Sequence, residues 1–511
     1  MFLKSSAIFS FLTFVSRIFG FIRDILIASF FGTGLFADAL NVALRLPNLF
    51  RNIFAEGALS AAFVPLFSSK LEVGGKKLAL KFAGNIFSIL IISLLLLILS
   101  LEIFMPTVIA GLAPGFKSYS IEKFNITTSL SYITTPYLFF ISLSVFFSCI
   151  LNSIGKFAAM AATPIILNFS MIVGILCFGE TQIEKTYAAA WSVTIGGMLQ
   201  LLFIIFFVIR QNLFPPITKP KITEESKKFY KNILPAVLGC SVTQINIWIG
   251  TIIATTIPGA VSLIYYCDRL VQLPISLIGV SIGIVILPAL SRYFKKKEID
   301  NAISTQNRAI EFSLILSLPC MVAVFALSEP IIRILFERGE FTSSDTIKAI
   351  PGLITLSIGL PAYIINKIIV PSFFAVQDTK TPVKISVTCL IINVVGNLIL
   401  IRFIGYYGIT LVTALTGWLN FSLLIFFAYK KGIFKFDSII KVKFLRILLS
   451  SIFLYLFLDA ISGLSRNFLN SDKSLVSISS FAGIIISGLI LYLYALRITG
   501  AYSFSDLKNI S

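Results

Sequence analysis

Apolar runs of roughly twenty residues recur along nearly the whole chain, and a helix needs about that length to cross the hydrocarbon core of a bilayer. Of the 511 residues, 57% are hydrophobic and 13% are charged, which leaves too little charge to cover a water-soluble fold of this size. A transmembrane barrel would instead show alternating segments of about ten residues, unlike IFSILIISLLLLILSLEIF at 86–104. The sequence therefore predicts an all-α polytopic membrane protein.

Breaking the apolar runs at charged or Pro/Gly-rich connectors predicts fourteen spans. Their centres lie near residues 18, 52, 95, 140, 167, 198, 242, 276, 317, 360, 393, 419, 450 and 485. An even number of spans places both ends of the chain on one side of the membrane. Most Lys and Arg fall on that side, which predicts cytoplasmic termini. The main basic connectors, which we expect to contact anionic membrane lipids, are 70–77, 215–231, 292–300 and 429–446.

The composition disfavours several other classes of function. The net charge of +19 is spread over short connectors without a nucleic-acid-binding module, so no nucleic acid partner is expected. The six cysteines lie in apolar runs without CxxC spacing and histidine is absent, which disfavours disulfides, metal sites and most metalloenzymes. The sequence contains no GxxxxGK[ST] loop, so direct use of ATP is not expected. We predict no cofactor.

The chain matches itself weakly at an offset of about 225 residues. The matched pairs are Ser16 with Ser241, Gly34 with Gly259, Pro136 with Pro361 and Asn168 with Asn393. Six spans per copy keep both copies in one orientation, which predicts two six-helix lobes in a pseudo-two-fold arrangement around a central cavity. The expected domains are an N-lobe at 1–212, a C-lobe at 213–432 and two additional spans at 433–511.

Charged residues inside the predicted spans are the main functional signal, because a charge at the bilayer centre usually faces a cavity or a partner. The basic ones are Arg17, Arg23, Arg45, Arg51, Arg269 and Lys367. At helical spacing, a single stripe less than about 90° wide is formed by Asp38, Asn41, Arg45, Asn48, Asn52 and Glu56. Arg51 lies off this stripe, and we expect Pro47 to kink the helix. Two further helices are expected to have a polar face. One face is formed by Arg17, Gly20 and Asp24, and the other by Ser262, Tyr265, Arg269 and Gln272.

Two interpretations of these arginines stay open. In the first, they pair with Asp24, Asp38, Glu56 and Asp268 and only hold helices together. In the second, the surplus of guanidinium groups awaits a multiply charged anion, and phosphate or pyrophosphate suits their bidentate geometry.

Several segments carry a resemblance to a known family. They are SRIFGFIRD at 16–24, GTGLFADALNVALRLPNLFRNIFAEGALSAAFVP at 32–65, VSLIYYCDRLVQLP at 261–274, GVSIGIVILPALS at 279–291 and PSFFAVQDTKTPVK at 371–384. Over nearly all of its length the chain resembles the bacterial lipid II flippases of the MurJ (MviN) family. That family belongs to the superfamily of multidrug, oligosaccharidyl-lipid and polysaccharide exporters.

The resemblance implies a protein of the bacterial cytoplasmic (inner) membrane that exports lipid II, an undecaprenyl-pyrophosphate-linked peptidoglycan precursor, by alternating access and without enzymatic activity. By the same resemblance, pyrophosphate would be held by Arg17, Arg23, Arg51 and Arg269. Asp38 would pair with or gate these arginines, and Ser16 would face the cavity beside them. Further cavity-lining positions are expected at Asp24, Arg45, Asn48, Glu56, Ser262, Tyr265 and Gln272. The two C-terminal spans would form a groove for the prenyl tail, with plain peripheral helices as the alternative.

Two positions depart from the family pattern. Relatives often carry an acidic residue at the position of Gln272. Some relatives bind sodium through a set that includes a carboxylate, whereas this chain offers Asn393 and Asn397; these amides form a candidate sodium site or, alternatively, hydrogen-bond two helices together. Sodium and chloride are both considered as ion partners.

Three alternative functions stay open. The chain could export another polyprenyl-linked oligosaccharide or a drug, although a basic cavity disfavours cationic drugs. It could be a membrane enzyme acting on a polyprenyl phosphate, but the outside connectors lack a histidine or a DxxD pair. The third alternative is a purely structural scaffold, but a scaffold would give the charged residues inside the spans no role.

Overall fold

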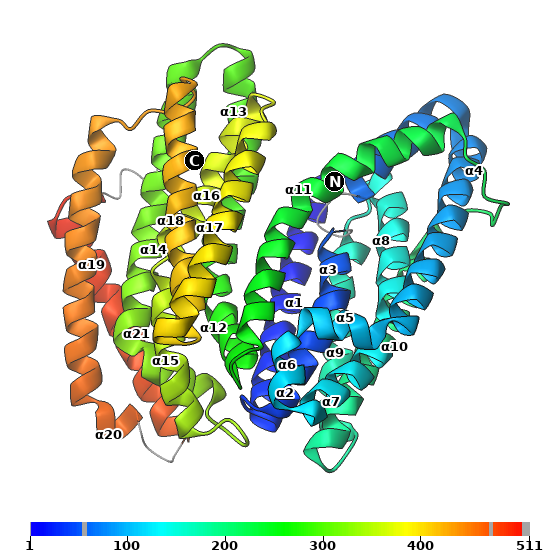
Figure 1. The fold of residues 1–511 in the computed structure, drawn as a ribbon. Coiled ribbons are helices and arrows are strands. Elements are labelled where there is room, and N and C mark those ends of the chain that lie inside the picture. The colour runs from blue at the N-terminus through cyan, green and yellow to red at the C-terminus, as the bar shows by residue number, and fades with distance from the viewer. Residues whose placement is uncertain (1, 54–58, 470–473, 503–511) are drawn as a thin grey trace. The chain divides into compact units, whose positions relative to one another are not determined.

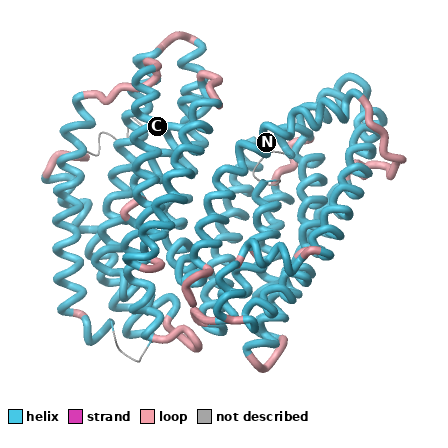
Figure 2. The backbone as a smooth tube through the Cα atoms, in the orientation of Figure 1, coloured by secondary structure: helices cyan, strands magenta, loops and turns pink. Residues whose placement is uncertain are grey.

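The computed structural model describes residues 2–53, 59–469 and 474–502, and all regular structure within them is helical, with no strand (Figure 2). The predicted all-α class is therefore confirmed. The chain divides into two compact units. Unit 1 comprises Met1–Ser262 with Gly339–Phe341, and unit 2 comprises Leu263–Arg338 with Thr342–Ser511.

Within the described residues, eleven helical segments are long and apolar enough to cross a membrane. Each of them contains one predicted span centre, and the three other centres, near 18, 52 and 242, lie in helices α1, α3 and α11. The protein is thus a polytopic helical membrane protein. The eleven segments are Ala62–Ile103, Ile121–Ser153, Ala158–Cys177, Gln182–Arg210, Ala260–Lys295, Ile299–Phe336, Ser343–Ala375, Lys380–Ile404, Tyr407–Lys430, Ser438–Leu464 and Leu475–Ile498.

Unit 1 contains the first eleven helices and the start of α12 (Figure 1). Helix α10 packs against α8 and α9, and α1 also packs against α9. The helices are α1 (Phe2–Phe31), α2 (Leu35–Ala43), α3 (Arg45–Ile53), α4 (Leu59–Ile103), α5 (Met105–Leu112), α6 (Pro114–Tyr119), α7 (Ile121–Thr134), α8 (Tyr137–Ser153), α9 (Ala158–Cys177), α10 (Gln182–Arg210) and α11 (Glu224–Ala254).

Helix α4 is two helices joined by a reversal at Gly75. The φ of Gly75 is 66°, a left-handed conformation that glycine adopts without steric cost. The rings of Phe63 and Phe82 stack with their centroids 5.7 Å apart, whereas nineteen residues of straight helix would separate them by about 28 Å. The chain therefore turns back within residues 70–77, the segment that the sequence analysis assigned to a connector. Phe146 of α8 packs edge-on against Phe63 and completes this aromatic core.

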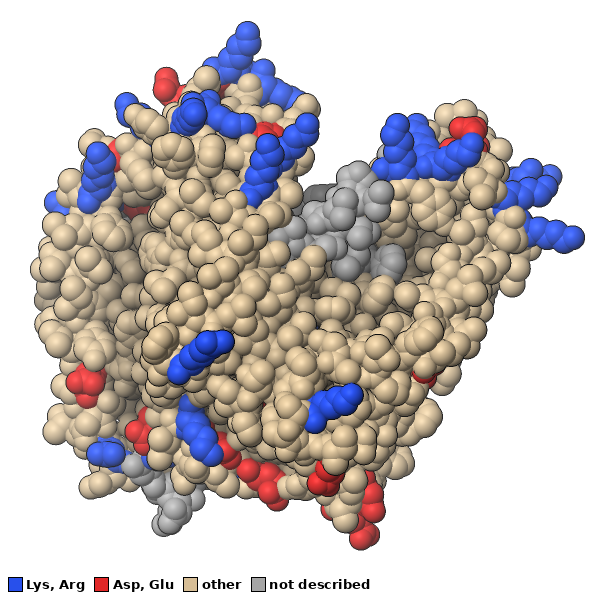
Figure 3. Space-filling model, viewed as in Figure 1, with Lys and Arg blue, Asp and Glu red and all other residues tan. Residues whose placement is uncertain are grey.

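Lysines gather at the end of unit 1 where α4 reverses, as the blue side chains in Figure 3 show. The segment 211–223 is tied to α4 there, because the side chain of Asn85 both donates to and accepts from the backbone of Lys221. The exposed lysines of this end include Lys76, Lys77, Lys219 and Lys221.

Unit 2 continues from α12 to α21. Helix α14 packs against α15, α16 and α19, and Tyr492 of α21 donates its hydroxyl to the carbonyl of Ile315 on α14 at 2.8 Å. The elements are α12 (Ala260–Pro274), the π-helical turn η2 (Ile275–Val280), α13 (Ser281–Lys295), α14 (Ile299–Phe336), α15 (Ser343–Ser357), α16 (Leu360–Ala375), α17 (Lys380–Ile404), α18 (Tyr407–Lys430), α19 (Ser438–Leu464), α20 (Arg466–Leu469) and α21 (Ser474–Ile498).

Two of the residue pairs matched by the predicted repeat occupy similar places along their helices. Gly34 directly precedes the first residue of α2, and Gly259 directly precedes the first residue of α12. Pro136 lies at the junction of α7 and α8, and Pro361 lies at the start of α16, just after α15. The two compact units divide after Ser262, because α11 packs on α3, α4 and α5. The lobe boundaries at 212 and 432 stay predictions.

Candidate functional site

On α1, the side chain of Arg23 joins two neighbours. Its Nε and Nη2 donate to Asp24 Oδ1 at 3.0 and 2.7 Å, and its Nη1 donates to Asn168 Oδ1 on α9 at 2.8 Å. Asn168 in turn donates to the backbone carbonyl of Ser16 at 3.1 Å. Asp24 is buried, so the charge of this arginine is matched locally. The pairing interpretation therefore applies to Arg23 and Asp24.

Gly20 makes room for this contact between α1 and α9. A Cβ atom at residue 20 would lie 3.3 Å from Nδ2 of Asn168, closer than most side-chain contacts. Ser16 and Arg17 lie one turn before Gly20 and are half-buried. Arg17 and Arg23 thus stand on one helix, and α9 binds Arg23 through the side chain of Asn168.

Helices α2 and α3 are separated at Leu44, so the polar stripe predicted for this span is not on one continuous helix. The cause is Pro47, which lacks an N–H and whose ring clashes with the carbonyl four residues earlier, that of Ala43. This carbonyl instead accepts a hydrogen bond from Thr134 Oγ1 of α7 at 3.1 Å. The kink expected from Pro47 is present, and it lies three residues before the proline.

The remaining predicted residues of this span lie on α3 or beyond it. Arg45, Asn48 and Arg51 are half-buried on α3. The Nε atom of Arg51 is buried and donates to no residue in the described part of the chain. Asn52 donates to Gln244 Oε1 of α11 at 3.2 Å. Glu56 lies outside the described residues.

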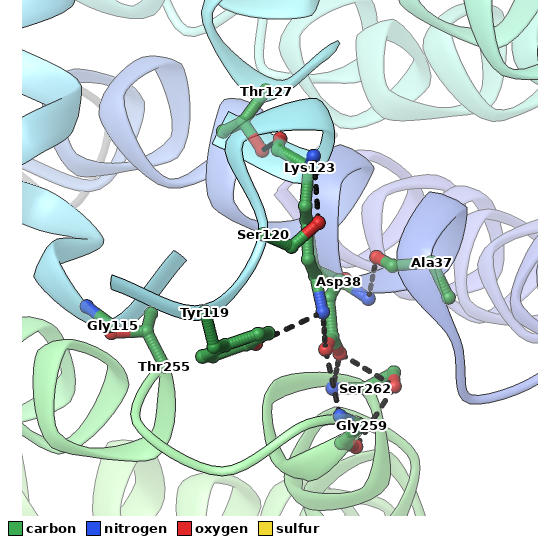
Figure 4. A network of polar contacts seen from close by, with 11 residues as sticks. Ala37, Asp38, Gly115, Tyr119, Ser120, Lys123, Thr127, Thr255, Gly259 and Ser262 are labelled. Atoms are coloured by element: carbon green, nitrogen blue, oxygen red, sulfur yellow. Dashed lines mark hydrogen bonds and ion pairs between the residues drawn. The ribbon is translucent and has the colours of Figure 1, made fainter. Parts of the chain in front are cut away.

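Asp38 lies in a buried network of polar contacts, shown in Figure 4. Its side chain is fully buried, and Oδ1 accepts from the backbone N–H and the hydroxyl of Ser262 at 2.8 and 2.7 Å. Its Oδ2 accepts from the backbone N–H of Gly259 at 2.9 Å. These donors belong to the N-terminus of α12, where backbone N–H groups have no helical partner and the helix dipole favours an anion. Asp38 of α2 therefore caps α12.

Gly259 must be a glycine for this approach. Its φ is +80°, and a Cβ atom there would lie 2.6 Å from the carbonyl oxygen of Thr33. The connector between α1 and α2 thus packs directly on the backbone that Asp38 caps.

The ion-pair partner of Asp38 is Lys123 of α7, a residue that the sequence analysis did not single out. Lys123 Nζ lies 2.5 Å from Asp38 Oδ2, and the lysine is 3% exposed. The ammonium also lies 4.4 Å from the ring centroid of Phe116, a cation–π contact, and donates to Tyr119 Oη at 3.3 Å. The only sequence signal was a lysine near the start of an apolar segment, which is common in connectors.

Tyr119 remains a neutral phenol beside this pair. Burial, with the nearby carboxylate of Asp38 as a second cause, raises the pKa of Tyr119 to about 12. Its hydroxyl can therefore accept the hydrogen bond from Lys123 over the whole physiological range of pH.

In unit 2, the predicted residues of α12 form a local cluster. The Arg269 guanidinium lies 4.7 Å from the ring centroid of Tyr265, and its Nη1 donates to Gln272 Oε1 at 3.5 Å. Gln272 also donates to Asp268 Oδ2 at 2.5 Å. Gln272 thus links an arginine and an aspartate with its neutral amide.

The candidate sodium residues hydrogen-bond to each other and to a neighbouring helix. Asn397 donates to Asn393 Oδ1 at 2.8 Å, and Asn393 donates to Thr416 Oγ1 of α18 at 3.0 Å. Among the described residues, no group of three or more His, Cys, Asp or Glu side chains is placed to hold a metal ion. Sodium binding stays a prediction.

Comparison with known proteins decides the family. The family model described as lipid II flippase MurJ matches residues 27–493. The chain belongs to the MurJ family. A protein of Rickettsia prowazekii named as a probable lipid II flippase MurJ is 39% identical over 489 residues, covering 96% of each chain. A MurJ relative with the same name from Rhizobium tropici is 39% identical over 424 residues, covering 82% of this chain and 79% of the relative.

Solved structures agree with membership of the MurJ family. The structure titled lipid II flippase MurJ, inward closed conformation, matches with a TM-score of 0.79 and 30% identity, over 98% of this chain and 99% of the other. An inward-facing multidrug transporter of the MATE family and MOP superfamily matches with a TM-score of 0.67 at 15% identity, over 82% and 94% of the two chains. The second likeness concerns the fold alone.

Proposed function

We propose that this protein flips lipid II from the cytoplasmic to the periplasmic leaflet of the bacterial inner membrane and catalyses no chemical reaction. The observation that carries the proposal is the match to the MurJ family over residues 27–493, in which relatives of the same length are named as probable lipid II flippases. The apolar helices of the chain carry basic residues that such a substrate would need.

The pyrophosphate of lipid II is a multiply charged anion, and guanidinium groups bind such anions through paired hydrogen bonds. We assign this role to Arg17, Arg51 and Arg269, and also to Arg23, which would exchange part of its pairing with Asp24 for the ligand, with Ser16 as a neighbouring polar contact. The buried Nε of Arg51, which donates to no described residue, supports the assignment. Burying a guanidinium group in a membrane protein costs free energy, and a ligand or partner that binds the group compensates for this cost.

The proposed mechanism is alternating access in a fold of fourteen spans with both termini in the cytoplasm. The count adds to the eleven apolar segments the three predicted spans whose centres lie in α1, α3 and α11. Spans one to six (1–212) and seven to twelve (213–432) would form two lobes around a central cavity. The additional spans within 433–511 would offer a groove for the prenyl tail of lipid II.

The membrane potential is a suitable energy source, because moving one elementary charge through 100 mV supplies about 2.3 kcal/mol. Sodium and chloride are the alternative coupling ions. A potential-driven flippase would respond to potassium diffusion potentials in vesicles, and an ion-coupled one to the corresponding ion gradient.

The test is a flipping assay with the purified full chain in proteoliposomes containing lipid II, in which the leaflet of the lipid is read by its accessibility to an external enzyme. We expect Arg17→Ala, Arg51→Ala and Arg269→Ala to lose at least about tenfold in rate, the loss of one charge-assisted contact. The matched control is Arg210→Ala, an exposed arginine at the end of α10. Wild-type rates in all three variants would contradict the arginine assignment.

The alternative within the superfamily is export of another polyprenyl-linked oligosaccharide. Competition between lipid II and other polyprenyl-pyrophosphate sugars in the same vesicles separates the two functions. Appearance of a cleaved or transferred product from lipid II would instead favour the enzyme alternative.

A further inference from the structure

We propose that Lys123 is a positioning residue for translocation that acts through Asp38. It keeps this carboxylate charge-compensated, so that the N-terminus of α12 can attach to α2 and detach from it. The inference rests on the proposed function, and it concerns a residue to which the arginine assignment gives no role.

The contacts of Asp38 fall into two classes. One is an ion pair with Lys123, which carries a full charge. The other consists of three hydrogen bonds from neutral donors, the N–H of Gly259 and the N–H and hydroxyl of Ser262. The ion pair compensates the charge of the carboxylate, and the neutral donors fill its remaining acceptor positions.

The two classes come from different parts of the chain. Asp38 and Lys123 both lie in the predicted N-lobe, and α7 holds the lysine on its own first turn. There Ser120 Oγ caps the backbone N–H of Lys123, and Thr127 donates to its carbonyl. Gly259 and Ser262 lie in the predicted C-lobe, and Ser262 is the last residue before unit 2 begins. Alternating access requires contacts of this second kind to open and close.

Charge compensation determines what such an opening would leave behind. A buried carboxylate without a counter-charge is costly, whereas a retained ion pair loses only hydrogen bonds that water can replace. Because Lys123 stays with α2 and α7, release of the α12 N-terminus leaves no net charge uncompensated.

The local sequence gives no other reason for a lysine at this position. Lys123 lies in the first turn of α7, where the helix dipole favours acidic residues and disfavours a cation. Its aromatic neighbour Phe116 would pack equally well on an apolar side chain such as methionine. The lysine is therefore explained by Asp38 and not by the stability of α7.

The experiment is a double-mutant cycle on the full chain with two readouts. Lipid II flipping measures transport, and hydrogen exchange of the amides of residues 259–262 measures the attachment of α12. In Lys123→Met we expect flipping to fall, and these amides to exchange more slowly, each on the order of tenfold, because opening would leave Asp38 without a counter-charge. Lys123→Arg keeps the charge and should retain most of both. Lys117→Met, which replaces an exposed lysine on α6, is the matched control.

The Asp38→Asn background separates positioning from packing. If Lys123 acts through Asp38, adding Lys123→Met to Asp38→Asn changes the exchange of 259–262 by less than about twofold. The double variant carries no unbalanced charge, so it should accumulate even where Lys123→Met alone does not. An equal loss in both backgrounds would overturn the proposal, because the lysine would then act through its packing on Phe116.

The two proposals can fail separately. A wild-type chain that does not flip lipid II refutes the proposed function, whatever the cycle shows. A chain that flips lipid II without coupling between positions 38 and 123 refutes the positioning role alone.

Discussion

The hydroxyl of Thr134 on α7 donates to the carbonyl of Ala43, the backbone acceptor that Pro47 deprives of its helical partner. A proline in a membrane helix is tolerated where a neighbouring side chain satisfies the freed backbone group. The break between α2 and α3 is therefore stabilised by a helix almost a hundred residues away along the chain. This break determines how α3, with Arg45 and Arg51, continues from the helix that carries Asp38.

We expect Thr134→Val to destabilise the protein by about 1 kcal/mol, because a buried carbonyl loses its donor while the side-chain volume is kept. Thermal unfolding in detergent measures the effect. Thr135→Val is the control, since the hydroxyl of Thr135 donates to the carbonyl of Ser131, one turn earlier on the same helix. The loss should shrink in a Pro47→Ala background, where the helix can satisfy Ala43 itself, and equal losses in both backgrounds would contradict this account.

Asn168→Leu should loosen α1 from α9. The change removes the acceptor of Arg23 Nη1 and the donor to the carbonyl of Ser16, so we expect about 1–3 kcal/mol of destabilisation. Asn168→Asp keeps an acceptor for Arg23 and should cost less. Thermal unfolding of the two variants, measured side by side, checks the order, and a leucine variant as stable as the wild type would exclude the bridging role of Asn168.

In unit 2, Glu311 should anchor α19 to α14. Its carboxylate accepts from Arg308 and from Lys443 of α19, each at 2.5 Å, and it is 6% exposed. Glu311→Leu removes the carboxylate with which Lys443 pairs, and we expect a loss of about 2–3 kcal/mol, less than for a fully buried pair because Arg308 is partly exposed.

Limited proteolysis between α18 and α19, together with thermal unfolding, measures this loss. Glu298→Leu is the control, because its ion pair with Lys296 is long and solvent-exposed and should contribute less than about 1 kcal/mol. Equal effects of the two substitutions would mean that Glu311 does not anchor α19.

The connector between α16 and α17 should contribute stability that depends on pH. Burial of Asp378 opposes its ionisation, but hydrogen bonds from Lys431 and Thr381 prevail and lower its pKa from 3.8 to about 2. A lowered pKa gives a contribution that is complete above the ordinary value and is lost as the pH falls through the folded value.

Asp378→Asn should therefore lower the unfolding temperature by a constant amount between pH 7 and pH 5, and the difference from the wild type should shrink between about pH 4 and pH 2. Unfolding curves at these pH values check the sign. A difference that grows towards low pH would contradict the assignment of Lys431 and Thr381 as the cause.

The amino-acid sequence determined the membrane-spanning class, most of the spans, the connector at 70–77 and the family. Each of these depends on local properties: hydropathy over about twenty residues, a pair of glycines flanked by charges, or motifs that are contiguous along the chain. It also located the kink caused by Pro47, since a proline acts on the carbonyl four residues before it.

Only the tertiary structure decided which partner each buried charge has. Lys123 lies 85 residues from Asp38, and Gly259 lies 221 residues from it. Asn168 reaches Arg23 across 145 residues. A single sequence shows where a charge must be compensated, because burial without a partner is costly. It does not show which residue compensates the charge, because many side chains could be its partner and only the packing of the helices brings one of them within hydrogen-bonding distance.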